Sequence, residues 1–63
     1  MRYEVVEITV MGCEYVYIID HILKKRLTMF GKDCVWPKTD TGQEHADTVC
    51  RIMNDLYLQN GVI

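Results

Sequence analysis

The residue types that could carry out chemistry are the cysteines and histidines, and their spacing argues against a catalytic or metal-binding role. Nucleophilic catalysis requires a cysteine with a base within reach. Cys50 follows His45 by five residues, which on a helix turns it off the histidine face, and it falls in an apolar stripe typical of core positions. Cys34 could join His21 or His45 around a zinc ion, but no two of them show the short pairwise spacing of zinc sites. We therefore predict no enzyme, no metal site and no cofactor.

A different chemistry is suggested by basic and aromatic residues in the segment 24–38. These are Lys24, Lys25, Arg26, Lys32, Trp36 and Lys38. Positive charge suits phosphate groups and an aromatic ring suits a base, so the segment could contact nucleic acid. The formal net charge of -2 argues against a dedicated phosphate binder. Nucleic-acid contact through this segment is therefore the alternative prediction.

Size and composition place the chain among ordinary globular proteins. It has 63 residues, of which 49% are hydrophobic and 25% are charged. Three cysteines without a C-x-x-C pair are typical of a reducing compartment. No apolar run approaches the length of a membrane span, and the first residues lack the pattern of a signal peptide. We expect one domain over residues 1–63, located in the cytoplasm and not in a membrane.

The first half of the sequence predicts antiparallel strands. The run 3–10 is rich in β-branched residues, although its alternation slips between Val5 and Val6, which indicates either a bulge or burial on both faces. Residues 11–13 form the predicted turn, the strand 14–20 follows, and a third strand over 26–30 ends at Gly31. Because Pro37 lacks a backbone donor, residues 34–36 are either a short fourth edge strand or a crossing loop.

The second half predicts one helix. Thr41-Gly-Gln-Glu44 fits a capping box that starts a helix, and Asn60-Gly61 supplies a stop. Apolar residues then recur at steps of three and four along one side, at Ala46, Val49, Cys50, Met53, Leu56 and Tyr57. The predicted fold is α+β, with the order β-β-β-α and a three-stranded, or four-stranded, antiparallel sheet packed on a C-terminal helix.

One helix can cover only one face of such a sheet. The strand 14–20 is apolar on both faces, because Tyr15 and Tyr17 alternate with Val16 and Ile18. Small and flexible aliphatic side chains pack well under a helix, so we expect the inward set to be Val16, Ile18, Leu27 and Met29. Tyr15, Tyr17 and Phe30 would then line the uncovered face, where adjacent aromatic rings form an apolar patch of interaction size.

The uncovered face predicts a small protein-binding module. The expected anchors are Tyr15, Tyr17, Phe30 and Trp36, and the expected orienting charges are Lys24, Lys25 and Arg26, because aromatic residues and arginine dominate binding hot spots. The partner could be a foreign protein or a second copy of the chain in a homodimer. A half-wet sheet surface without a partner is the competing interpretation.

The order of elements resembles small proteins encoded by bacteriophages, in which a short antiparallel sheet precedes a helix. The helix segment "TDTGQEHADTVCRIMNDLYLQN" matches their loose pattern A-x-x-x-C-x-x-M/L-N through Ala46, Cys50, Met53 and Asn54. The resemblance implies a host-modulating inhibitor that binds a host protein, such as an immune nuclease or a component of transcription, in the host cytoplasm. An excess of two acidic residues is too small to imitate nucleic acid, so inhibition would act through an apolar and aromatic patch.

Overall fold

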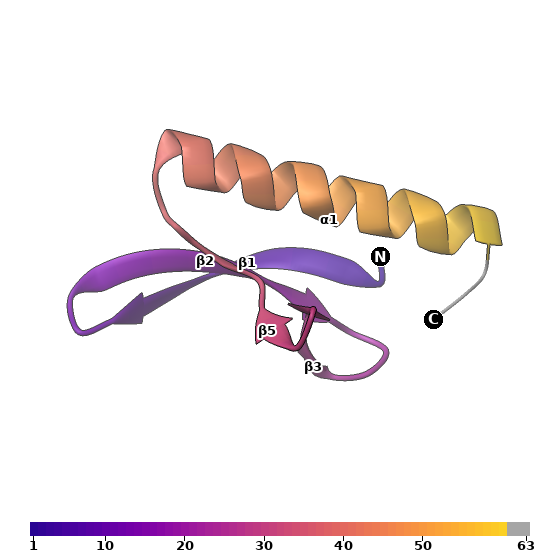
Figure 1. Cartoon of the computed structure of the whole chain (residues 1–63), viewed down its shortest axis with the longest axis horizontal. Coiled ribbons are helices and arrows are strands. Elements are labelled where there is room, and N and C mark those ends of the chain that lie inside the picture. The colour runs from indigo at the N-terminus through magenta and orange to yellow at the C-terminus, as the bar shows by residue number, and fades with distance from the viewer. Residues whose placement is uncertain (61–63) are drawn as a thin grey trace.

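The computed structural model describes residues 1–60 and shows the predicted α+β fold, with an antiparallel sheet packed against a C-terminal helix (Figure 1). The elements are β1 (Tyr3–Val10), β2 (Cys13–Asp20), β3 (Lys25–Arg26), β4 (Thr28–Met29), β5 (Lys32–Asp33), β6 (Val35–Pro37) and α1 (Asp40–Asn60). Part of the predicted helix stop, Gly61, lies outside the described residues.

A regular hairpin of β1 and β2 is the centre of the sheet. Its register runs without interruption from Tyr3 opposite Asp20 to Val10 opposite Cys13, so β1 contains no bulge. The connecting turn consists of Met11 (φ 51°) and Gly12 (φ 82°), and positive φ at both central residues is what a type I′ hairpin turn requires. The apolar residues of β1 therefore belong to both faces of the sheet.

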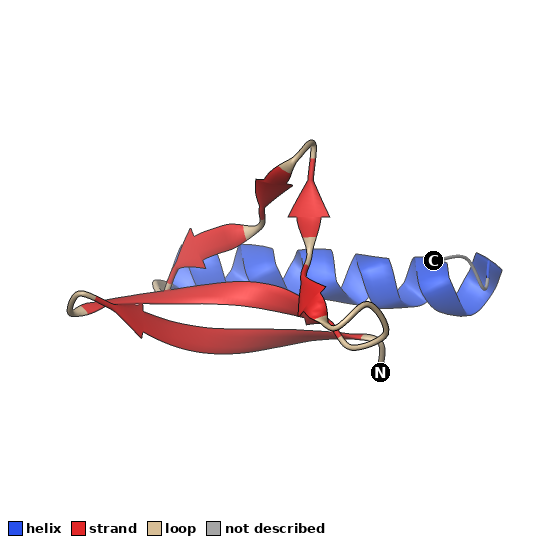
Figure 2. Ribbon diagram, turned by 90° about the horizontal axis from the view of Figure 1, so that it is seen from below, coloured by secondary structure: helices blue, strands red, loops and turns tan. Residues whose placement is uncertain are grey.

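The third column of the sheet is one strand interrupted by a second hairpin. Arg26 in β3 pairs with Ile19 and Val35 in β6 pairs with Tyr17, so β3 and β6 lie along the same edge of β2. The chain between them leaves the sheet as the β4–β5 hairpin, which projects beyond the edge in Figure 2. Its base is closed by a bond from the Cys34 amide to the Leu27 carbonyl (3.1 Å).

The prediction of a continuous third strand over 26–30 was therefore wrong. Phe30 (φ 54°) and Gly31 (φ 78°) form a tight turn that folds the chain back on itself and gives β4 its own partner, β5. The segment Cys34–Trp36, which the sequence left open between strand and loop, contributes to β6. It extends the β3 edge and does not form a separate fourth column.

The helix begins at Asp40, one residue before the predicted capping box, and its cap lies two residues before Thr41. Thr39 is the cap, because its hydroxyl accepts a bond from the Gly42 amide (3.1 Å) and its carbonyl accepts one from the Gln43 amide (2.8 Å). The glycine is required because a Cβ on Gly42 would overlap the carbonyl oxygen of Pro37. Thr41, the predicted cap, lies inside the first turn of the helix and does not cap it.

The inner face of the sheet forms the core with the helix. Val16 and Ile18 are completely buried and Leu27 is nearly so, as predicted. From the helix, Cys50 packs in one cluster with Ile18 and Leu27, and Ala46 is also buried. Met29 was assigned to this set, but it lies in the β4–β5 hairpin and is 41% exposed. Leu56, at the margin of the predicted helix stripe, is 48% exposed.

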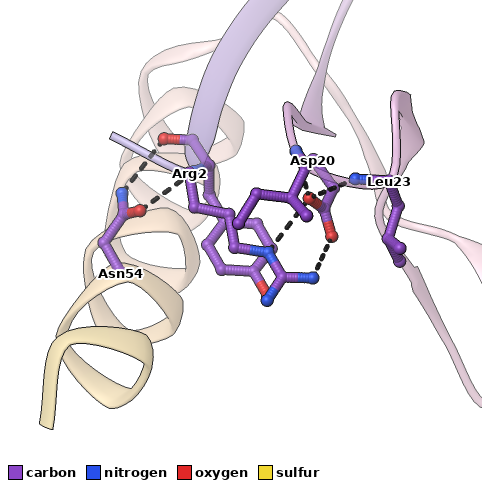
Figure 3. Close-up of polar contacts among 6 residues, drawn as sticks. Arg2, Asp20, Leu23 and Asn54 are labelled. Carbon is purple, nitrogen blue, oxygen red and sulfur yellow. Dashed lines mark hydrogen bonds and ion pairs between the residues drawn. The ribbon is translucent and has the colours of Figure 1, made fainter. Parts of the chain in front are cut away.

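A buried asparagine joins the helix to β1. Asn54 accepts a bond from the amide of Tyr3 (2.9 Å) and donates one to the carbonyl of Tyr3 (3.0 Å), as Figure 3 shows. Tyr3 stands on an edge strand, so without Asn54 both of its backbone groups would lack a partner in a buried position. The side-chain amide therefore closes this end of the sheet against the helix.

A buried ion pair lies beside this contact. Arg2 donates to both carboxylate oxygens of Asp20, at 3.0 Å and 2.7 Å (Figure 3). Its guanidinium also lies over the rings of Tyr3 and Tyr57. Asp20 also accepts bonds from the amides of Ile22 and Leu23, which shapes the connection after β2. The hydrogen bonds from Arg2 hold the pKa of the Asp20 carboxyl below its usual value.

Replacement of Asn54 by alanine should lower the free energy of unfolding by about 2–3 kcal/mol, because two buried backbone groups of Tyr3 lose their partner. Urea denaturation measures the loss, and faster exchange of the Tyr3 amide hydrogen locates it. Asp55→Ala, at the next and exposed position, is the matched control. Equal losses in the two variants would contradict the role given to Asn54.

Replacement of Asp20 by asparagine should lower the melting temperature at neutral pH and have little effect in strong acid. Folding lowers the pKa of Asp20, so its ionised carboxylate stabilises the fold at pH values above the ordinary pKa of 3.8. This stabilisation is lost as the pH falls through the lowered pKa. Melting curves of both chains between neutral pH and strong acid should therefore converge below pH 3.8. A difference in melting temperature that is independent of pH would contradict this assignment.

Candidate functional site

The face of the sheet turned away from the helix, called here the outer face, is an ordered array of mostly apolar side chains. In an antiparallel pair, residues directly opposite one another place their side chains on the same face. The registers therefore define cross-strand rows, which are Glu4–Ile19–Arg26, Val6–Tyr17–Val35, Ile8–Tyr15–Pro37 and Val10–Cys13. Tyr15 and Tyr17 occupy the centre of this array.

The outer face is only partly covered. Tyr15 and Tyr17 are half-buried by their neighbours, whereas Val10 and Val35 at the periphery are 46% and 42% exposed. An open hollow of about 300 Å³ lies over this surface, lined by Ile8, Val10, Tyr15, Tyr17, Arg26 and Val35. The prediction that the tyrosines lie opposite the helix agrees with this geometry, and Figure 1 shows the helix on the other side of β1 and β2.

Charges on the outer face are found at one end and are locally compensated. The guanidinium carbon of Arg26 lies 4.6 Å from the centre of the Tyr17 ring, and its Nη1 lies 3.8 Å from Asp33. On the other edge Glu4 contacts His21 at 2.8 Å. The outer face thus combines an apolar centre with one basic and one acidic corner in the same row.

The β4–β5 hairpin adds a projecting aromatic ring. Phe30 is fully exposed at its tip, although a left-handed backbone conformation is unfavourable for a bulky residue and exposure of its ring contributes no core packing. In Figure 1, β3 and β5 lie displaced from β1 and β2 toward the side opposite the helix. The hairpin therefore flanks the outer face. The prediction that Phe30 lies on the sheet face itself was wrong, because the turn at Phe30 and Gly31 carries the ring off the main sheet. Its role as an anchor stays a prediction.

Trp36 does not join this surface. Its register partner is Val16, which places the indole on the inner face, where it packs half-buried against the core. The prediction that groups Trp36 with Tyr15 and Tyr17 is therefore corrected. The physical reason is the alternation of side chains along β6, which turns Val35 and Pro37 outward and Trp36 inward.

The basic segment 24–38 does not form one continuous positive surface. Lys38 contacts Glu7 (3.0 Å) and Glu14 (3.7 Å), and the hydrogen bond to Glu7 raises the pKa of its ammonium group. Lys24 is exposed in the connection after β2. Lys25 is exposed in β3 and pairs in register with Asp20 on the inner side. Of the three predicted orienting charges, only Arg26 lies on the outer face.

Several residues of the outer face were not predicted as part of it. Val6, Ile8 and Val10 come from β1, and Val35 comes from β6. Ile19 lies on the same face as Tyr15 and Tyr17, as the alternation along β2 predicts. The β1 residues share one parity in the sequence, which is a usable signal once β1 is paired with β2. Val35 could not be placed because its position depends on where the interrupted strand rejoins the sheet.

The thiols and histidines form no reactive cluster. Burial raises the pKa of the Cys34 and Cys50 thiols, which keeps them in the neutral, weakly nucleophilic form near pH 7. Cys13 is exposed on the outer face. Within residues 1–60 no group of three or more histidine, cysteine or acidic side chains is arranged to hold a metal ion.

The chain matches no known protein family, no curated protein and no solved structure in comparisons of sequence and fold. The likeness to bacteriophage proteins therefore depends on the sequence pattern alone. No helix in residues 1–60 combines the length and apolarity needed to cross a membrane.

Thiol accessibility provides a direct test of the positions assigned to the cysteines. Cys13 should react with an aromatic disulfide reagent at least about tenfold faster than Cys34 and Cys50, whose neutral and sheltered thiols require local opening. The absorbance of the released thiolate follows the reaction. Cys13→Ser should remove the fast phase and leave the slow phases unchanged; a fast phase that persists in this variant would contradict the assignment.

Proposed function

We propose that the chain is a small, non-catalytic protein-binding module and that the outer face is its binding surface. The observation that carries the proposal is the position of Tyr15 and Tyr17 at the centre of an apolar array on the face opposite the helix. Large, partly exposed apolar patches mark interaction sites more often than isolated apolar residues do. Tyrosine suits this role because its ring is apolar and its hydroxyl tolerates water.

The charge distribution favours a protein over a nucleic acid as the partner. Arg26 is the only basic residue among the outer-face rows, and Asp33 compensates it. A phosphate backbone requires several cations along one surface. Contact with nucleic acid through the exposed Lys24 and Lys25 is the alternative, and it uses a different surface.

The resemblance to bacteriophage proteins supports a more specific form of the proposal, in which the partner is a host protein and binding inhibits it. The half-exposed tyrosines, with Arg26 over Tyr17 and Phe30 beside the face, provide an aromatic surface with a charged corner. Such a surface can bind a partner protein by contact alone and needs no catalytic residue. An inhibitor of this kind acts by occupying a site.

Affinity capture with matched variants tests the proposal. The wild-type chain should retain a protein from a lysate of its native host that the double variant Tyr15→Ser, Tyr17→Ser does not retain. Leu58→Ser removes a similar apolar group from the exposed side of the helix, at a residue that is 77% exposed, and should bind like wild type. Circular dichroism spectra must agree among the three chains.

Salt dependence separates the two classes of partner. Binding through the outer face should change little between low and moderate salt, because apolar contacts are not screened. Binding to phosphates should weaken by orders of magnitude over the same range and should respond to Lys24→Ala and Lys25→Ala. Loss of binding in the lysine variants, together with full binding by the tyrosine double variant, would overturn the proposal.

A further inference from the structure

We propose that a second copy of this chain occupies the outer face, related to the first by a twofold axis that runs along β2 in the plane of the interface. The inference rests on the proposed function, because it names a partner for the same surface. Isologous dimers of this kind require a surface that is complementary to itself. The rows of the outer face meet this requirement.

The charged row selects the direction of the axis. Glu4, Ile19 and Arg26 lie side by side on β1, β2 and β3, so the acid and the base stand on opposite edges at the same level along the strands. A twofold axis along β2 exchanges the two edges and places Glu4 of each copy opposite Arg26 of the other. An axis across the strands would move the charged row of one copy to the far end of the other copy and leave Glu4 and Arg26 with only their partners within the same chain, His21 and Asp33.

The same axis pairs apolar side chains in the two middle rows. Tyr17 and Tyr15 meet their own counterparts near the axis, where offset aromatic packing is favourable. Val6 lies opposite Val35 of the second copy, and Ile8 lies opposite Pro37. Two sheets that face each other in this way form the aligned sandwich known from many β proteins.

The β4–β5 hairpins gain a role in this arrangement. Each hairpin projects beyond the β3 and β6 edge (Figure 2) and is displaced toward the side opposite the helix (Figure 1). The twofold axis places the β1 edge of the second copy beneath that same edge. Phe30, fully exposed in the single chain, then lies beside β1 of the other copy and is partly covered.

The size of the surface sets the strength of the dimer. A rectangle three strands wide, at about 4.8 Å per strand, and eight residues long, at about 3.3 Å per residue, has an area of about 380 Å². This is an upper limit for the projected area of the outer face, because β3 and β6 together pair five residues with β2. Stable interfaces bury about 800 Å² per partner. The outer face provides at most about half of this area, so the dimer should be reversible, with dissociation at micromolar concentrations or above.

Charge reversal tests the axis by sedimentation velocity at low salt, over chain concentrations from about 10 µM to about 1 mM. Wild type should shift from monomer to dimer. Glu4→Arg and Arg26→Glu should each raise the dissociation constant about tenfold or more, because each places like charges opposite one another twice. The double variant should return to within about threefold of wild type. Lys24→Glu, an equal charge change outside the outer face, should have no effect.

A second measurement does not depend on charge. Cys13 lies on β2 in the last row, so the axis brings the two Cys13 thiols near each other. A short bis-maleimide reagent should link two wild-type chains and should not link Cys13→Ser chains, in which the sheltered Cys34 and Cys50 are the remaining thiols. Absence of the linked dimer at concentrations where sedimentation shows dimers would overturn the axis.

Failure of this inference is distinguishable from failure of the proposed function. The wild-type chain could stay monomeric at about 1 mM while the tyrosine double variant fails to capture the host protein. This outcome overturns the dimer and leaves the proposed binding module in place. A dimer that persists in the tyrosine double variant places self-association on another surface and also overturns the dimer proposed here. If the tyrosine double variant still self-associates and still captures the host protein, both the dimer and the proposed function are overturned.

Discussion

The main constraint on the described part of the chain is that a single helix packs against the sheet and covers one of its two faces. Residues 1–60 contain one helix, and one helix shelters one face of a narrow sheet. Because β1 and β2 carry apolar side chains on both faces, packing against the helix leaves an apolar surface without a second layer. In a chain of 63 residues the buried core is necessarily small, and Val16 and Ile18 are its largest completely enclosed side chains. Within residues 1–60, the outer face therefore follows from the composition of β1 and β2 and from the presence of one covering helix.

Polar contacts fix how the helix lies on the inner face. Aliphatic packing is nondirectional and would tolerate several orientations of a helix on a sheet. Asn54 removes this freedom because its side-chain amide bonds to both backbone groups of Tyr3. The ion pair of Arg2 with Asp20 joins the residue before β1 to the end of β2. At the other end, the close contact of Gly42 with Pro37 and the cap at Thr39 set where the helix begins. The two ends together hold the helix along the sheet.

The interruption of the third strand links the fold to the proposed function. A continuous strand would bury Leu27 and Met29 on one side and leave Phe30 within the sheet. The β4–β5 hairpin instead removes residues 28–33 from the sheet, returns Val35 to the position opposite Tyr17, and presents Phe30 at a projecting tip. The outer face consequently has a flat apolar centre, contributed by three chain segments, and an aromatic projection at its edge. This shape suits a partner that is itself a flat surface.

The sequence by itself determined the periodic features of this protein. Alternation in 13–20 and the steps of three and four in 46–57 are local properties, and they correctly placed the β1–β2 hairpin, the helix, and Val16 and Ile18 beneath it. Only the tertiary structure decided that Trp36 turns inward, that Lys38 pairs with Glu7 and Glu14, and that Thr39 caps the helix. It also decided that Asn54 serves Tyr3, 51 residues away. Each of these depends on which distant segments meet, because local periodicity specifies the face of an element but not the neighbour that the face contacts.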